Sequence, residues 1–164
     1  MSIQYDVIIV GAGAAGMMSA IEAGKRGRKV LLVDHYKKIG EKIRISGGGR
    51  CNFTNINTNP SKFLSQNPKY VRSALSQYTQ NDFINLIKKY EIKFHEKKLG
   101  QLFCDHSAQQ IVEMLLKECE LAKVTVLKEF IIKSVEKDND QYLVSTETEQ
   151  YSSESLIVAT GGLS

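Results

Sequence analysis

The sequence predicts an α/β fold with a central parallel sheet and a smaller antiparallel β layer. Three observations predict it. Residues 3–10 end in a near-continuous apolar run, typical of a strand buried on both faces of a parallel sheet. A glycine-rich turn, a helical segment and a second apolar run follow at once, which is a βαβ start. Several short β-rich runs then gather in the last 40 or so residues, where they favour the antiparallel layer.

Composition and charge narrow the class of protein. The 164 residues are 42% hydrophobic, enough for one globular unit, and we expect residues 1–164 to form a single domain. The formal net charge is only +4 and is spread along the chain, so composition gives no case for a nucleic-acid partner. No apolar run approaches the roughly 20 residues that cross a bilayer, and the N-terminus has no basic flank or cleavage site. We therefore expect a cytoplasmic protein with no membrane partner.

The cysteines and histidines carry little information about function. Cys51, Cys104 and Cys119 are an odd number without Cys-x-x-Cys spacing, so we expect reduced thiols rather than a disulfide framework. The three histidines lie far apart with no acidic residue at ligand spacing. The sequence therefore predicts no metal site and assigns no catalytic residue.

The elements follow in order from the hydrophobic pattern. A helix is predicted over residues 14–26 and a second buried strand over 29–33. Residues 37–59 have no clear period and are rich in Gly, Ser and Asn, so we expect a long functional loop. Helices are predicted over 68–77 and over 81–90, the second with Asn81 as its N-cap.

Residues 93–159 are predicted to contain mostly strands. A hairpin is expected between residues 93–97 and 101–104, and Ser107 is expected to cap a helix that extends to Cys119. Further strands are predicted at residues 124–127, 130–135, 142–146 and 156–159, with a turn at 138–140.

The motif Gly11-Ala12-Gly13-Ala14-Ala15-Gly16 points to dinucleotide binding. Its glycines allow a tight turn, a close approach of backbone to a pyrophosphate, and packing of the helix on the strand. The free N–H groups and the dipole of the following helix favour phosphate at its N-terminus. The alternative is that the glycines only permit a close turn and that Asp34 is a solvated charge at a strand end.

Asp34 supports the first of these interpretations. It ends the second strand, close to the 20-residue interval expected for a carboxylate that accepts hydrogen bonds from ribose hydroxyls. A carboxylate there also disfavours the 2′-phosphate of NADP, because the two charges are alike. FAD and NAD both fit.

Two further segments bear on the choice between FAD and NAD. In residues 42–55, three consecutive glycines expose backbone N–H groups and Lys42, Arg44 and Arg50 add positive charge, so the segment can hold an anion; the alternative is a flexible basic loop. Residues 156–162 run from a buried strand into a glycine turn, which can approach a second part of the same cofactor; the alternative is a plain strand end.

Taken together, these motifs resemble a family of bacterial NAD(P)/FAD-dependent oxidoreductases, the HI0933-like or BaiN-like flavoproteins. The run Ser-Gly-Gly-Gly-Arg-Cys-Asn-x-Thr-Asn at residues 46–55 is the most specific part of this resemblance, which covers the whole chain. The resemblance implies a glutathione-reductase-like FAD-binding Rossmann domain. It implies transfer of reducing equivalents from a nicotinamide, NADH or NADPH, through FAD to an organic small-molecule acceptor.

The same resemblance implies a set of cofactor-binding residues. The first glycine motif would face the pyrophosphate, Asp34 the adenosine ribose, and backbone near Ile132 the adenine. Residues 46–52 would lie between the pyrophosphate and the flavin, and Thr160 and Gly161 at a second approach to FAD. The full set is Gly11, Gly13, Ala14, Ala15, Gly16, Asp34, Lys42, Ser46, Gly47, Gly48, Gly49, Arg50, Cys51, Asn52, Ile132, Thr160 and Gly161.

One departure from the family leaves two other functions open. Members of the family continue through an inserted domain and a later segment that completes the FAD site, whereas this sequence stops at Ser164. We therefore expect a truncated N-terminal portion, in which the substrate pocket is largely absent. The alternatives to an oxidoreductase are a noncatalytic nucleotide-binding remnant and a flavin-free NAD-binding protein. The sequence leaves the oligomeric state open.

Overall fold

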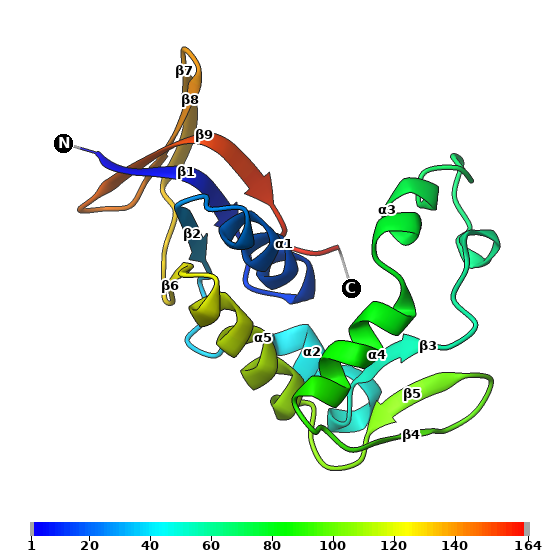
Figure 1. Ribbon diagram of the computed structural model, residues 1–164. Coiled ribbons are helices and arrows are strands. Elements are labelled where there is room, and N and C mark those ends of the chain that lie inside the picture. The colour runs from blue at the N-terminus through cyan, green and yellow to red at the C-terminus, as the bar shows by residue number, and fades with distance from the viewer. Residues whose placement is uncertain (1, 163–164) are drawn as a thin grey trace. The chain divides into compact units, whose positions relative to one another are not determined.

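The computed structural model describes residues 2–162, and the chain divides into two compact units (Figure 1). The first unit contains residues up to 42 and from 115 onward, and the second contains residues 43–114. The sequence predicted one globular unit. Residues 43–114, however, have their own sheet and their own buried side chains, so they form a separate hydrophobic core. The assignment of residues 1–164 to a single FAD-binding domain stays a prediction.

A six-stranded mixed sheet forms the first unit, in the order β6-β2-β1-β9-β8-β7. Its strands are β1 (Ile3–Val10), β2 (Val30–Val33), β6 (Thr125–Leu127), β7 (Ser134–Asp138), β8 (Gln141–Ser145) and β9 (Gln150–Val158). β6, β2, β1 and β9 are parallel neighbours, whereas β9, β8 and β7 pair antiparallel. The α/β class with a parallel sheet and a smaller antiparallel sheet is confirmed, but the late strands β7 and β8 extend the main sheet, and the smaller antiparallel sheet is formed by residues 52–104 instead.

Helix α1 (Ala14–Lys25) packs on the parallel strands because its apolar residues recur every three or four positions. Gly16, Met17, Ala20 and Ile21 are its buried residues. The first unit also contains a cluster of buried side chains from the sheet and from the segment before β7. These are Tyr5, Ile8, Leu31, Val33, Phe130, Val144 and Tyr151.

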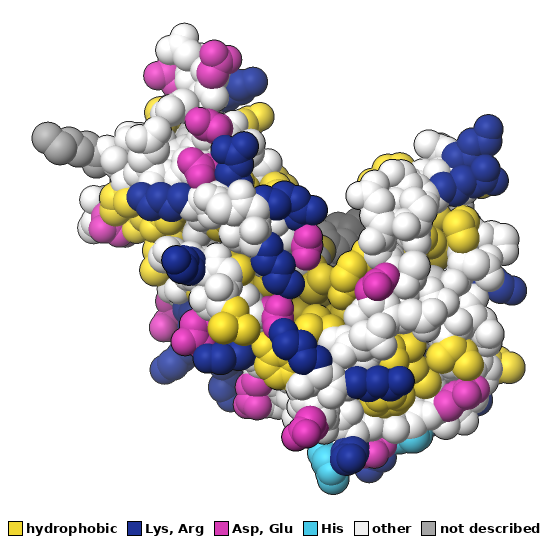
Figure 2. Space-filling view, viewed as in Figure 1, with side chains coloured by type: hydrophobic (Ala, Val, Ile, Leu, Met, Phe, Trp, Pro, Cys, Tyr) yellow, Lys and Arg dark blue, Asp and Glu magenta, His cyan; other side chains and the backbone are white. Residues whose placement is uncertain are grey.

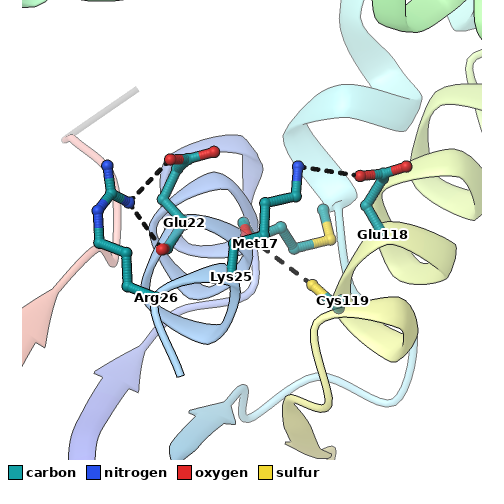
Figure 3. A network of polar contacts seen from close by, with 6 residues as sticks. All are labelled: Met17, Glu22, Lys25, Arg26, Glu118 and Cys119. Atoms are coloured by element: carbon teal, nitrogen blue, oxygen red, sulfur yellow. Dashed lines mark hydrogen bonds and ion pairs between the residues drawn. The ribbon is translucent and has the colours of Figure 1, made fainter. Parts of the chain in front are cut away.

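A partly buried ion pair joins α1 to helix α5 (Gln109–Leu121), whose residues from Leu115 onward belong to the first unit (Figure 3). Lys25 Nζ lies 3.2 Å from Glu118 Oε2, and the Glu118 side chain is only 3% exposed against 50% for Lys25. About two turns of α1 away, the Cys119 thiol donates to the carbonyl oxygen of Met17 at 3.8 Å. The buried Glu118 carboxylate is thus paired with a cation whose side chain is half exposed to solvent.

The second unit contains short helices and a three-stranded antiparallel sheet in the order β3-β5-β4. Its sheet consists of β3 (Asn52–Asn55), β4 (Phe94–Glu96) and β5 (Gln101–Cys104). The helical elements around it are α2 (Glu41–Ile45), which begins in the first unit, η1 (Ser46–Gly49), η2 (Pro60–Lys62), α3 (Arg72–Gln77) and α4 (Gln80–Lys89). The predicted hairpin is confirmed as β4 and β5.

Several element boundaries differ from the prediction. Residues 37–59 are not one long loop, because α2, η1 and β3 lie within them. The cap of α4 is Thr79 rather than Asn81: the Thr79 backbone N–H donates to Asp82 Oδ2 at 2.7 Å and the Asp82 N–H donates back to Thr79 Oγ1 at 3.3 Å. A helix appears only from Arg72 in the 68–77 segment.

Residues 130–133 were predicted as strand, but β7 begins only at Ser134. The backbone N–H of Phe130 instead donates to the carbonyl oxygen of Asp34 at 3.0 Å, which holds this segment beside the end of β2. Among residues 2–162, no helix is long and apolar enough to cross a membrane.

All three cysteines are buried free thiols. Burial raises the pKa of Cys104 to about 12 and that of Cys119 to about 11, and it also raises the pKa of Cys51. The Cys51 thiol therefore stays protonated at neutral pH and is not activated as a nucleophile.

We predict that Lys25→Gln lowers the free energy of unfolding by about 1–2 kcal/mol, because it removes the ion pair between Lys25 and the buried Glu118 carboxylate. The matched control is Lys117→Gln, which removes an exposed helical pair with Glu120 and is expected to change stability by less than about 0.5 kcal/mol. Urea unfolding followed by circular dichroism measures both. Equal losses in the two variants would contradict the interpretation.

We also predict that the native thiols react slowly with a disulfide reagent at pH 8 and rapidly in denaturant, because burial keeps them protonated. The raised pKa values have a second consequence. The folded state holds these protons more tightly than the unfolded chain, so stability is retained below about pH 9 and falls as pH rises from 9 toward 12. Stability that stays level or rises over that interval would show that the folded state does not hold these thiol protons more tightly than the unfolded chain does.

Candidate functional site

Three chain segments meet at the carboxyl edge of the parallel sheet in the first unit. Val10 is in register with Val33 on one side and with Val158 on the other. The residues that follow the three strands, Gly11, Asp34 and Ala159, therefore emerge side by side. In doubly wound α/β folds this edge is where ligands bind.

Packing within the protein requires glycine at two of the three motif positions. Gly11 has φ +104°, and a Cβ there would lie 2.5 Å from the carbonyl oxygen of Ala159. A Cβ on Gly16 would lie 1.8 Å from the carbonyl oxygen of Gly11. These two glycines let the turn, α1 and the end of β9 approach one another closely.

Gly13 is different, because nothing in the protein requires a glycine there. Its φ of −84° suits any residue, and no atom lies within 4 Å of the position that its Cβ would take. Gly13 is the N-cap of α1, yet it supplies no side-chain cap, and no acidic residue occurs in the first turn. The exposed start of α1 at Ala14 and Ala15 thus presents N–H groups to an open space that suits an anion.

The Asp34 carboxylate is part of this turn rather than a solvated charge, since its side chain is only 10% exposed. Oδ2 accepts from the backbone N–H of Ala12 at 2.7 Å, and Oδ1 accepts from that of Tyr36 at 2.9 Å. Each oxygen keeps a further lone pair for hydroxyl donors. The interpretation of Asp34 as a solvated strand-end charge is therefore wrong.

The sequence did not indicate how Asp34 and its neighbours would be connected to the glycine turn. Ala12, which was not assigned a role, donates to Asp34 and also accepts at its carbonyl oxygen from the N–H of Gly40 at 3.1 Å. The only feature of the sequence that hinted at the bond between Gly40 and Ala12 was a glycine in an irregular segment. In the structure, Gly40 has a φ of +73°. Ile132 packs partly buried against the core cluster two residues after Phe130, and its contact with adenine stays a prediction.

The turn after β9 brings in Thr160, Gly161 and Lys42. The N–H of Ala159 donates to the carbonyl oxygen of Val10 at 2.8 Å, so this turn starts directly beside Gly11. Thr160 and Gly161 are exposed, and Lys42 Nζ donates to the carbonyl oxygen of Gly162 at 3.2 Å. A cation from a distant part of the sequence thus reaches this edge of the sheet.

Within residues 42–55, the segment predicted to hold an anion, three consecutive glycines form a left-handed turn in the second unit. Gly47, Gly48 and Gly49 have φ values of +59°, +67° and +85°. The carbonyl oxygen of Ser46 accepts from the N–H of Cys51 at 3.0 Å, and that of Gly49 from the N–H of Ala108 at 2.7 Å. These bonds connect the turn to neighbouring backbone within the second unit.

Side chains around the loop divide into buried and exposed groups. Cys51 is buried, whereas Arg50 and Asn52 are exposed. A Cβ on Gly47 would contact the Phe103 ring at 2.7 Å, but the space above Gly48 is open. The cofactor-binding role of these residues stays a prediction.

No catalytic or metal-binding group emerges from residues 2–162. None of their His, Cys, Asp and Glu side chains gather in threes at a spacing that could hold a metal ion. His95 Nδ1 lies 2.7 Å from Asp105 Oδ1, but both side chains are exposed on the β4–β5 hairpin. The pair is outside the glycine turn and its neighbours.

Comparison with known proteins agrees with this geometry. Residues 5–164 match the HI0933-like protein Rossmann domain. The chain is 53% identical over 161 residues to a protein of Escherichia coli (strain K12) named ribosomal RNA dihydrouridine synthase, and 24% identical over 157 residues to the 3-dehydro-bile acid delta(4,6)-reductase of Clostridium scindens. The matches cover 98% and 94% of this chain but only 40% and 38% of those proteins, so the chain spans about two fifths of their length.

Solved structures show the same fold at low sequence identity. A 3-ketosteroid-delta4-(5alpha)-dehydrogenase from Rhodococcus jostii RHA1 has a TM-score of 0.67 at 12% identity, over 98% of this chain and 46% of that one. NikD, an amino acid oxidase, has a TM-score of 0.59 at 15% identity, over 98% of this chain and 52% of that one. With a family match over nearly its whole length and the glycine turn of that fold, the chain belongs to the HI0933-like Rossmann domain family.

Proposed function

We propose that the chain is the FAD-binding part of an oxidoreductase that reduces a carbon–carbon double bond conjugated to a carbonyl group. The observation that carries FAD binding is Gly13, where the protein leaves an open space in front of the uncapped first turn of α1. A pyrophosphate would fill that space and accept from the N–H groups. The residues present therefore fit a dinucleotide.

The other site residues of the first unit have separate roles in this proposal. Asp34 would accept hydrogen bonds from the ribose hydroxyls with the lone pairs that Ala12 and Tyr36 do not use. Lys42, fixed by Gly162, would add positive charge near the phosphates, and the exposed backbone at Thr160 and Gly161 would contact a second part of the cofactor.

The type of reaction is supported by the names of two relatives. A dihydrouridine synthase saturates the C5–C6 bond of uracil, which is conjugated to a ring carbonyl, and a 3-dehydro-bile acid delta(4,6)-reductase acts on double bonds conjugated to a ketone. The chemistry that bound FAD would supply is transfer of a hydride from a reduced nicotinamide to one alkene carbon, while a proton adds to the other. The chain's own residues would bind and orient the cofactor for this transfer.

We further propose uridine in RNA as the acceptor. Two relatives at 53% and 48% identity are named ribosomal RNA dihydrouridine synthase, against 24% for the bile-acid reductase. This departs from two expectations: a small-molecule acceptor, which the family resemblance implied, and the absence of a nucleic-acid partner, which depended on the small net charge and its spread along the chain. Net charge does not reveal how charge is distributed along the chain.

We predict that Gly13→Ala leaves the melting temperature of the apoprotein within about 2 °C of wild type, because no protein atom opposes the new methyl group. It should weaken FAD binding at least tenfold, since the methyl group would occupy the space for the pyrophosphate. Fluorescence quenching of FAD titrated with the chain measures affinity. Unchanged affinity in a folded Gly13→Ala variant would exclude pyrophosphate from this position.

The contrasting variant is Gly16→Ala, whose Cβ would clash with backbone at 1.8 Å. It should lower the melting temperature by more than about 10 °C or prevent folding, whatever ligand is present. If wild-type chain binds NAD but not FAD by calorimetry, the protein is a flavin-free nucleotide binder and the proposal fails.

We predict that the oxidoreductase of which this chain is the FAD-binding part, once loaded with FAD, loses its visible flavin absorbance when NADH or NADPH is added without oxygen, and regains it when a uridine-containing RNA is added. Mass spectrometry of the RNA should then show a gain of two hydrogen atoms on uridine. Regain of absorbance with a small conjugated enone but not with RNA would assign the acceptor to the bile-acid class instead. No reduction by either nicotinamide would favour a noncatalytic remnant.

A further inference from the structure

Positive charge is concentrated in one stretch of the sequence. Residues 42–81 contain six Lys and Arg and no Asp or Glu, whereas the other 124 residues hold 16 Lys and Arg against 18 Asp and Glu. The whole net charge of +4 thus combines +6 in this stretch with −2 in the rest. Our expectation that charge is evenly spread along the chain was wrong.

Half of these cations lie on residues 56–72 of the second unit, which we call the basic arm. The arm contains η2 and ends at Arg72, the first residue of α3. Its cations are Lys62, Lys69 and Arg72, all exposed, and among the described residues none of them has a carboxylate partner. Figure 2 shows Lys and Arg side chains gathered at the outer end of this arm, with no acidic side chain visible beside them. Anions can therefore approach it without competing with an internal ion pair.

The basic arm also exposes aromatic and apolar side chains that a folded domain ordinarily buries. Every residue from 61 to 70 is exposed, including Leu64 at 96% and Tyr70 at 78%. Phe63 and Leu64 line a groove of about 410 Å³ together with Arg72 and Pro68. A flat aromatic ring next to unpaired cations is the combination that binds single-stranded nucleic acid by stacking on bases and pairing with phosphates.

Local hydrogen bonds, rather than a core, fix the backbone of the arm. Asparagine side chains accept from backbone N–H groups two residues later: Asn55 from Asn57 at 2.8 Å, Asn59 from Ser61 at 3.0 Å, and Asn67 from Lys69 at 3.2 Å. Such turns hold the chain in place without using its Lys, Phe, Leu or Tyr side chains. The side chains suited to a ligand thus remain available.

We propose that the basic arm binds single-stranded RNA, with Lys62, Lys69 and Arg72 on phosphates and Tyr70 stacked on a base. This inference deepens the proposed function and rests on it for the choice of RNA as partner. An anionic membrane could also attract cations beside Leu64, but the arm carries exposed amides at Asn57, Gln66 and Asn67, which pair with base edges and gain nothing from acyl chains.

The test is fluorescence anisotropy of a labelled uridine-rich 15-nucleotide RNA titrated with the 164-residue chain at several KCl concentrations. The variant Lys62→Gln/Lys69→Gln/Arg72→Gln should bind at least tenfold more weakly at low salt, and its plot of log affinity against log salt should be flatter by about 2, since each lost contact with single-stranded phosphate removes about 0.7. The control Lys88→Gln/Lys93→Gln/Lys98→Gln removes the same charge from exposed positions elsewhere in the second unit and should bind RNA nearly as wild type does.

Stacking is tested by a pair of substitutions at one position. Tyr70→Ala should lower RNA affinity about tenfold at any salt concentration without changing the salt dependence, whereas Tyr70→Phe should retain wild-type affinity because it keeps the ring. Equal effects of Tyr70→Ala and Tyr70→Phe would overturn the stacking contact.

Two outcomes would overturn the inference as a whole. One is equal weakening by the two triple variants, which would show general charge attraction. The other is binding of wild-type chain to anionic phospholipid vesicles but not to RNA. FAD titration of the same samples keeps the two proposals separate, because a chain that binds FAD but no RNA refutes only the arm, and one that binds RNA but no FAD refutes the cofactor assignment.

Discussion

The close approach of the Gly11 turn to the end of β9 is the constraint on which the first unit depends. β1 lies between β2 and β9 as parallel neighbours, so the chain leaves all three strands at the same edge of the sheet. Only a residue without a side chain can then pass the carbonyl oxygen of Ala159 at Gly11. Because α1 starts from this turn, the same constraint fixes where its N-terminus points.

The three glycines of the motif therefore differ in whether contacts inside the protein require them. Gly11 and Gly16 are required by contacts inside the protein, where a methyl group would overlap backbone atoms. Gly13 is not required by any such contact, and its missing side chain leaves open space in front of the first turn of α1. Asp34 combines both roles, since it fixes the turn through the Ala12 N–H and retains capacity for an external donor.

The second unit is organised by different means. Its sheet buries Cys51, Leu102 and Cys104, but the arm from η2 to α3 is shaped by asparagine turns and leaves aromatic and basic side chains in solvent. Exposed apolar groups have no stabilising role in the isolated unit, so their presence in an acid-free stretch points to a binding partner. The two units thus present separate surfaces, one suited to a dinucleotide and the other to a polyanion.

The sequence by itself determined the α/β class, the first βαβ unit, the β4–β5 hairpin and the edge of the sheet where Gly11 and Asp34 meet. Each of these depends on local periodicity or on glycine at fixed spacing, which a linear sequence displays. Only the tertiary structure decided that residues 43–114 form a separate unit, that β7 and β8 extend the main sheet, and that Lys42 reaches Gly162. These features depend on contacts between residues far apart in the chain. The cap of α4 was misplaced for a local reason, because Thr79 and Asn81 are both good cap residues and only the reciprocal bond with Asp82 selects between them.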